Sequence, residues 1–154
     1  VCFAWCSPFL TVYRLARDGE AFRFSSKLLD ALAAATRASV YAGTWSGTTG
    51  QDKDLTFKVN SRGRVTYLQV GWSASGAGCQ IEATTTMKSL SVPISTHKKF
   101  QVRTQMGNTS LVVAGQMLSK AKSSGSLRVT VVDTTGYGCS GSARTSWTAR
   151  KGAA

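Results

Sequence analysis

The chain contains a single histidine, His97, in a polar stretch that predicts a loop. Zinc sites built from three histidines, or from two histidines and a carboxylate, are therefore excluded. A Ser-His-Asp triad would have to use this one histidine, but the Gly-x-Ser-x-Gly motif of many hydrolases is absent. A solvated loop histidine is the favoured interpretation, and we predict no catalytic residue, metal ion or cofactor.

The carboxylates that follow residue 40 are Asp52, Asp54, Glu82 and Asp133. Glycoside hydrolysis needs two carboxylates about 5 to 10 Å apart across a cleft. Asp54 and Glu82 can form such a pair if both lie on one sheet, whereas Asp52 and Asp54 also fit a turn without any chemistry. A small secreted hydrolase of glycans or esters, which uses His97 or the Asp54/Glu82 pair, is therefore one alternative hypothesis.

The four cysteines are Cys2, Cys6, Cys79 and Cys139. The last two are 60 positions apart and lack a Cys-x-x-Cys partner, which argues against a zinc ribbon. A bridge between them would stabilise the fold by roughly 4 kcal/mol in the chain-entropy model. An oxidising, extracellular setting is therefore favoured. Cys2 and Cys6 fit either a small disulfide loop or two free thiols, and we favour the thiols.

The composition predicts one ordinary domain with a strongly basic surface. The chain has 154 residues, 42% of them hydrophobic, and a formal net charge of +12. Such a surface attracts polyanions, whether nucleic acid, anionic cell-wall polymer or acidic lipid, although charge also serves solubility alone. No run of 18 apolar residues occurs, so the sequence predicts no membrane-spanning helix.

Residues 1–39 differ in character from the rest of the chain. One helical window, Ser25–Ala38, begins with serine N-caps and carries leucines at spacings of three and four. We interpret 1–39 as a leader or helical extension that is disordered in part. Because the chain starts without Met, a processed leader and a non-native one both fit.

From Tyr41 onward the apolar period changes to two, which predicts strands. Residues 40–152 are expected to form an antiparallel β-sandwich of seven or eight short strands, and turn signals also fit a barrel. Trp45, Trp72 and Trp147 are expected in the core, as are Phe100 to Met106 on alternate positions. The segment 119–125 is expected to be a loop.

The residues predicted to face away from the core include many cations. Such a polar, basic face suits phosphate or carboxylate polymers through charge-assisted hydrogen bonds. A solvated face that discourages strand-edge aggregation is the simpler interpretation. The candidate ligand-binding residues are Lys58, Tyr67, Arg103, Arg128, Arg144 and Arg150, with Lys88 on the same side.

A series of short motifs runs along the chain after residue 40: Gly43-Thr-Trp45-Ser-Gly47-x-Thr49, Phe57-x-Val59, Cys79, Phe100, Gly115-x-Met117, Ala121-x-x-x-Gly125-x-Leu127, Cys139-x-Gly141 and Trp147-Thr-Ala-Arg150. Their order resembles an uncharacterised all-β domain of secreted or cell-surface proteins from high-GC Gram-positive and related bacteria. The resemblance covers about 110 residues and implies a Cys79–Cys139 disulfide, a sandwich and an exported location, with no catalytic residues. The chain departs from the pattern at Met117, where Phe is usual, and in its longer Ala121–Gly125 spacing.

The sequence thus favours a secreted or cell-surface module with a binding or structural role over an enzyme. Its expected partner is an anionic cell-wall polymer or a polysaccharide, and any binding of nucleic acid is expected to be non-specific. Besides hydrolysis, a further alternative is self-assembly through strand edges into a surface fibre.

Overall fold

The described strands follow the alternating apolar pattern of the sequence. The computed structural model describes residues 39–133 and 138–152, and this part of the chain contains strands, turns and loops but no helix. The strands are β1 (Gly43–Thr49), β2 (Asp54–Val59), β3 (Arg64–Gly76), β4 (Cys79–Met87), β5 (Val92–Pro93), β6 (Lys99–Met106), β7 (Thr109–Met117), β8 (Lys122–Val131) and β9 (Gly141–Lys151).

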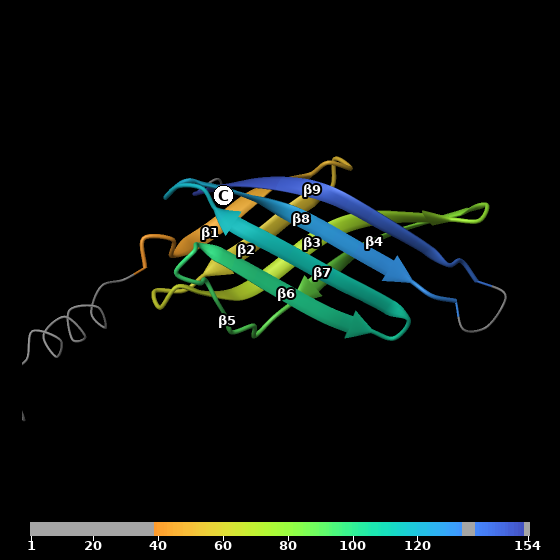
Figure 1. Ribbon diagram of the computed structural model, residues 1–154, viewed down its shortest axis with the longest axis horizontal. Coiled ribbons are helices and arrows are strands. Elements are labelled where there is room, and N and C mark those ends of the chain that lie inside the picture. Colours follow the sequence, from red (N-terminus) through yellow and green to blue (C-terminus); the bar gives the residue numbers. More distant parts are fainter. Residues whose placement is uncertain (1–38, 134–137, 153–154) are drawn as a thin grey trace, which may run out of the picture. The chain divides into compact units, whose positions relative to one another are not determined.

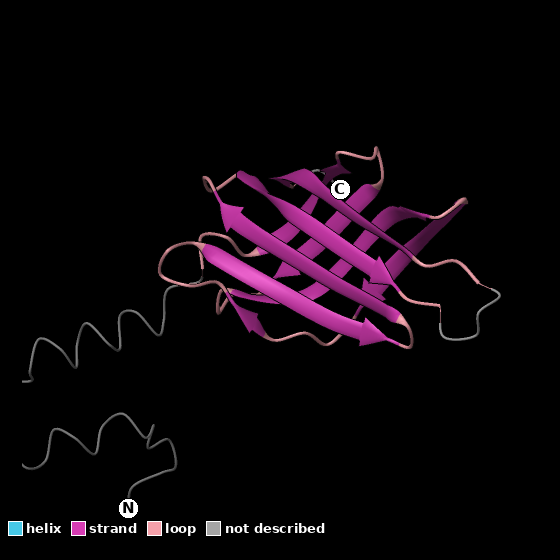
Figure 2. Cartoon of the chain, turned by 45° about the vertical axis from the view of Figure 1, so that its right-hand side comes forward, coloured by secondary structure: helices cyan, strands magenta, loops and turns pink. Residues whose placement is uncertain are grey.

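The strands form one continuous antiparallel sheet in the order β4-β3-β2-β1-β9-β8-β7-β6. β1 connects the two halves of the sheet because it pairs with both β2 and β9. The sheet is rolled, so that the β6–β9 half crosses over the β1–β4 half (Figures 1 and 2). The described strands therefore enclose a small barrel-like core within a single sheet, and a sandwich of two separate sheets is not confirmed.

Four aromatic rings fill the centre of the core between the two halves. Trp45 stacks on Phe57 with 5.5 Å between ring centroids, and Trp147 meets Phe57 edge-on at 5.8 Å. Phe100 completes the cluster at 5.4 Å from Phe57. Trp45 and Trp147, together with Trp72, are buried as the sequence predicted.

Two glycines make room for the indole of Trp147. Gly125 lies directly opposite both Gly115 and Trp147 in the sheet register. A Cβ atom at Gly125 would lie 2.6 Å from ring atoms of Trp147, and one at Gly115 would lie 2.8 Å from them. Any larger residue would therefore collide with the indole and with a still nearer neighbour, which is the backbone carbonyl of Ala114 at Gly125 and the ring of Phe100 at Gly115.

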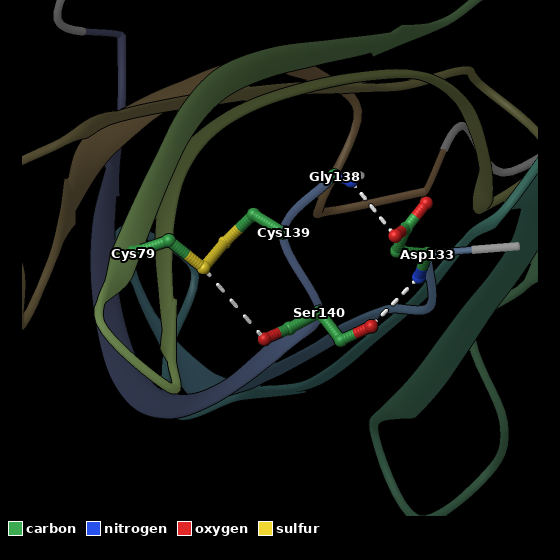
Figure 3. Close-up of a disulfide and its surroundings, with 5 residues drawn as sticks. All are labelled: Cys79, Asp133, Gly138, Cys139 and Ser140. Atoms are coloured by element: carbon green, nitrogen blue, oxygen red, sulfur yellow. Dashed lines mark hydrogen bonds between the residues drawn. A yellow bond between two sulfur atoms is a disulfide. The ribbon is translucent and has the colours of Figure 1, made fainter. Parts of the chain in front are cut away.

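The disulfide ties the two halves together at one end of the sheet. It joins Cys79, at the start of β4, to Cys139, which precedes β9, with 5.9 Å between Cα atoms (Figure 3). Beside it, Ser75 of β3 pairs with Ser142 of β9. The expected pairing of these cysteines is confirmed, and such a bond forms in an oxidising environment.

The segment around Cys139 is also held by hydrogen bonds of Asp133. The backbone N–H of Asp133 donates to Ser140 Oγ at 2.7 Å (Figure 3). The Asp133 carboxylate in turn accepts a hydrogen bond from the N–H of Gly138 at 2.8 Å. This acid therefore has a structural role beside the disulfide.

Two local expectations are wrong. Met106 was expected in the core but is 41% exposed, because it lies at the β6–β7 turn, beyond the enclosed part of the strand. The segment 119–125 was expected to be a loop, whereas β8 begins at Lys122 and pairs with β9 from that residue onward.

The expectations for the first part of the chain fall outside the described residues. These are the helix over Ser25–Ala38 and the states of Cys2 and Cys6. All described strands belong to one compact unit, residues 38–154.

Candidate binding surface

Three arginines lie in one row across the outer face of the β6–β9 half. Arg128 of β8 lies directly opposite Arg144 of β9. On its other side, Val112 of β7 separates Arg128 from Arg103 of β6 in the same register. All three arginines are exposed, because the residues that alternate with them fill the core. We call Arg103, Arg128 and Arg144 the arginine row. With strands about 4.8 Å apart, it spans about 14 Å.

The arginine row has no acidic neighbour on its own half of the sheet. Strands β6, β7, β8 and β9 contain no Asp or Glu. Among the described residues, the one ion pair joins Lys53 to Glu82 on the other half. Arg103 donates a hydrogen bond to Gln101 Oε1 at 3.3 Å. Guanidinium groups without an acidic partner keep their capacity for bidentate bonding to carboxylate, sulfate or phosphate.

Lys58 and Tyr67 were predicted on the same face as these arginines but lie on the other half of the sheet. They oppose each other on β2 and β3, with Lys58 Nζ 5.5 Å from the centroid of the Tyr67 ring. The Tyr67 hydroxyl donates to Gln69 Oε1 at 2.7 Å. Because the core lies between the halves, outward residues of the two halves point away from each other. The predicted ligand-binding residues therefore divide into two surfaces.

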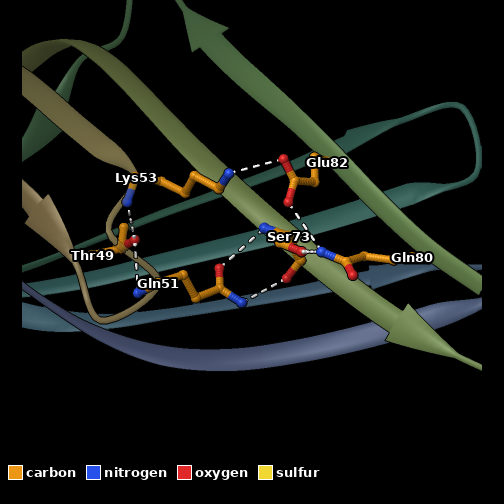
Figure 4. Close-up of polar contacts among 6 residues, drawn as sticks. All are labelled: Thr49, Gln51, Lys53, Ser73, Gln80 and Glu82. Carbon is orange, nitrogen blue, oxygen red and sulfur yellow. Dashed lines mark hydrogen bonds and ion pairs between the residues drawn. The ribbon is translucent and has the colours of Figure 1, made fainter.

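The turn between β1 and β2 is fastened to β3 by the side-chain amide of Gln51. Its Nε2 donates to the carbonyl of Ser73 at 2.7 Å, and its Oε1 accepts from the N–H of Ser73 at 3.0 Å (Figure 4). Because β2 begins only at Asp54, Ser73 has no β2 residue opposite it, and the amide takes the place of a peptide group. This contact could not be predicted from the sequence, because it depends on where β2 starts.

Glu82 of β4 is held as a carboxylate on this same half. Lys53 Nζ lies 2.9 Å from Glu82 Oε2, and Gln80 Nε2 donates to Oε1 at 3.0 Å (Figure 4). The hydrogen bond from Lys53 and its charge lower the pKa of Glu82 below its ordinary value, with a smaller contribution from Gln80. A catalytic general acid needs a raised pKa, so this environment suits an acceptor of hydrogen bonds instead.

A polar cleft of about 650 Å³ opens on the outer face of the β1–β4 half. Asp52, Asp54 and Glu82 line it, together with Lys53 and residues of four strands. The Asp54/Glu82 pair of the hydrolase hypothesis therefore faces a single cavity. We call this cavity the acidic cleft, because Lys53 offsets only one of its three carboxylates among the described residues.

A second hollow, of about 390 Å³, lies on the outer face where β1, β9 and β8 run side by side. Lys122 and Arg150 lie opposite each other on its lining, next to the hydroxyls of Ser124 and Thr148. We call it the basic groove. Arg150 was a predicted ligand-binding residue, whereas Lys122 was missed because its segment was taken for a loop.

The remaining candidates for chemistry do not assemble. His97 is exposed in the loop between β5 and β6 and makes no hydrogen bond or ion pair with another described residue. Within 39–133 and 138–152, no group of three His, Cys, Asp or Glu side chains is placed to hold a metal ion. The same residues include no helix long and apolar enough to cross a membrane.

No protein-family model matches this chain, and no match is found among curated proteins or solved structures. Its function has to be inferred from its own surface.

Proposed function

We propose that residues 40–152 form an extracellular module that binds anionic polymers, with the arginine row as its contact surface. The observation that supports this best is the alignment of three exposed guanidinium groups in one register row, on strands without acidic residues. A polymer with repeated sulfate, phosphate or carboxylate groups presents acceptors at intervals, and arginine binds such groups in a bidentate manner.

The arrangement also carries an electrostatic cost that a ligand would remove. Arg128 and Arg144 are directly opposed on neighbouring strands, and like charges in that position destabilise a sheet. Neither arginine forms an ion pair with a described acid. A bound polyanion supplies the missing counter-charge, and its affinity should fall with added salt.

The disulfide supports an oxidising location, from which we propose export to the cell surface or medium. The resemblance to cell-surface domains agrees with this proposal and favours a cell-wall polymer or polysaccharide as the partner. Nucleic acid would bind through charge alone, without sequence preference.

The test is a triple variant, Arg103→Gln, Arg128→Gln and Arg144→Gln, compared with a charge-matched control, Arg62→Gln, Lys88→Gln and Lys120→Gln. The control cations are exposed and lie outside the row. Binding to heparin, teichoic acid, DNA and a neutral glucan is measured at several salt concentrations without reductant. We expect the row variant to bind polyanions about tenfold or more weakly. For DNA, the slope of the logarithm of the binding constant against the logarithm of the salt concentration should become shallower by about three.

The control should lose much less, and the neutral glucan should not bind. Equal losses in the two triple variants would show that net charge alone attracts the polymer, and the arginine row would be rejected. Absence of polyanion binding in the unaltered protein would reject the module.

Hydrolysis remains the second candidate, because Asp54 and Glu82 line one cavity. The lowered pKa of Glu82 leaves it as a base or nucleophile and not as a proton donor. Incubation with glycan and ester substrates decides between the two functions. Turnover that Asp54→Asn abolishes, in a variant that unfolds at the same temperature, would establish hydrolysis.

A further inference from the structure

The acidic cleft and the basic groove are neighbours on the outer surface. Ser46 and Gly47 of β1 line both of them. β1 also pairs with β2 on one side and β9 on the other, so the two hollows adjoin across this strand. Together the two adjoining hollows extend over six strands, from β4 and β3 across β2 and β1 to β9 and β8. We call this combined hollow the trough.

The polar residues on the floor of the trough lie in two transverse rows of the sheet, and the exposed Leu118 also lines the basic groove. Each residue lies directly opposite the next one on the neighbouring strand. The first row is Gln69, Thr56, Ser46, Arg150 and Lys122, and the second is Asp54, Thr48, Thr148 and Ser124. Both rows change from amide or acid on one half to hydroxyls in the middle, and the first row ends in two cations.

The hydroxyl groups in the middle of the trough have unused hydrogen-bonding capacity. The side chains of Ser46, Thr48, Thr56, Ser124 and Thr148 make no hydrogen bond with another described residue, and each is exposed or half-buried. A serine or threonine hydroxyl both donates and accepts, as do the hydroxyls of a sugar. This strip therefore suits a polyhydroxylated ligand better than an apolar one.

The two ends of the trough differ in charge. At one end, Asp52 and Asp54 form no ion pair with another described residue, while Glu82 is already paired with Lys53. At the other end, Lys122 and Arg150 stand side by side without an acid on their strands. From Asp54 on β2 to Lys122 on β8 there are three strand intervals, or about 14 Å.

We propose that the trough binds an oligosaccharide that carries both a free amine and an acidic group. The amine lies at the Asp54 end, the acidic group lies between Arg150 and Lys122, and the sugar hydroxyls contact the strip between them. This site is separate from the arginine row, since Arg128 and Lys122 are six residues apart on β8, or about 20 Å along the strand. It does not require that row to bind anything.

The test compares three hexasaccharide probes on the full chain. The first is an O-sulfated heparin fragment with unsubstituted amines, the second is a fully N-sulfated fragment without amines, and the third is chitosan, which carries amines but no acid. Binding to each is measured by calorimetry for the unaltered protein and for Asp54→Asn, Arg150→Gln and Arg62→Gln. Arg62 is the control for Arg150, because it is an exposed arginine that lies outside both the trough and the arginine row.

We expect Asp54→Asn to lower the affinity for the amine-bearing heparin fragment about fivefold to tenfold, because the amine loses a charged acceptor. The affinity for chitosan should fall as well. The affinity of the same variant for the fully N-sulfated fragment should stay the same or rise. Arg150→Gln should weaken binding of the amine-bearing fragment more than Arg62→Gln does, and should leave binding of chitosan unchanged. Equal effects of Asp54→Asn on all three probes would overturn the proposal, as would interchangeable effects of the two arginine variants.

A measurement without variants guards against a loss of folding. In a nuclear magnetic resonance titration of the unaltered chain, the amine-bearing fragment should shift the backbone amides of Ser46, Thr56 and Thr148 at lower concentration than those of Arg103 and Arg128. The reverse order would reject the trough. The separate proposal that the arginine row binds polyanions would be rejected if its triple variant bound long heparin with unchanged affinity.

Discussion

The two halves of the rolled sheet use polar side chains in different ways. On the β1–β4 half, Gln51 completes the hydrogen bonding of β3, and Lys53 pairs with Glu82. On the β6–β9 half, Arg128 and Arg144 face each other with no acid on their strands. These polar groups of the first half therefore contribute to stability, whereas the two facing arginines of the second half reduce it. Under our proposal, a bound polyanion would supply the counter-charge that these arginines lack.

The largest expected effect concerns the covalent tie between the halves. Replacing Cys79 and Cys139 together with alanine should lower the free energy of unfolding by about 4 kcal/mol, because the closed loop constrains the unfolded chain. Guanidinium denaturation of the two proteins measures this difference. A loss below about 1 kcal/mol would mean that the Ser75–Ser142 pairing and the shared core hold the halves without the bond.

A glutamine from each half tests the comparison directly. Gln51→Ala should cost about 1 to 3 kcal/mol, because the N–H and C=O of Ser73 lose their partner. Gln116→Ala is the control on β7, where the side chain is exposed and bonds to no other described residue. It should change stability by less than about 0.5 kcal/mol. Equal losses in urea denaturation would remove the distinction between the halves.

The arginine row predicts a change of the opposite sign. Arg144→Gln should raise stability by a few tenths of a kcal/mol at low salt, because it removes the like charge opposite Arg128. The gain should shrink in high salt, where the repulsion is screened. Thermal unfolding at two salt concentrations measures this. A destabilised variant would show that Arg144 has a structural partner.

The smallest effect is a pH dependence confined to the β1–β4 half. Because Lys53 lowers the pKa of folded Glu82, this pair stabilises the fold at pH values above the ordinary glutamate pKa. The contribution is lost as the pH falls through the lowered pKa of the folded state. The difference in melting temperature between the unaltered protein and Glu82→Gln should therefore be present at pH 6 and disappear in strong acid. A difference that stays constant with pH would exclude this pair as its source.

Strand parity was the part of the structure that the sequence revealed best. Alternation places Trp45 and Trp147 inside and Arg128 and Arg144 outside, because each strand has one face on the core. Parity cannot say which residues are opposite each other, since register depends on where each strand starts and on its neighbour. The arginine row and the division of the basic residues between two halves were therefore beyond sequence reasoning.

Strand boundaries explain most of what was missed at the site. Lys122 begins β8 within a serine-rich segment that has no apolar alternation, and its pairing with β9 overrides that local composition. Gln51 matters only because β2 starts after β3 has already extended to Ser73. Neither fact leaves a local signal. The rolled sheet itself follows from the pairing of β1 with β9, a contact between distant parts of the chain.

That pairing has a consequence for how the protein is made. β1 is the first strand and β9 the last, so one edge of β1 stays open until the final strand has been synthesised. Contacts between such distant segments form slowly, and a strand with free N–H and C=O groups is a template for association with other chains. A chain that stalls before β9 thus exposes the edge beside Trp45, and a finished one covers it. This particular edge is therefore a site of aggregation only while the chain is being made, and it is removed once β9 pairs with β1.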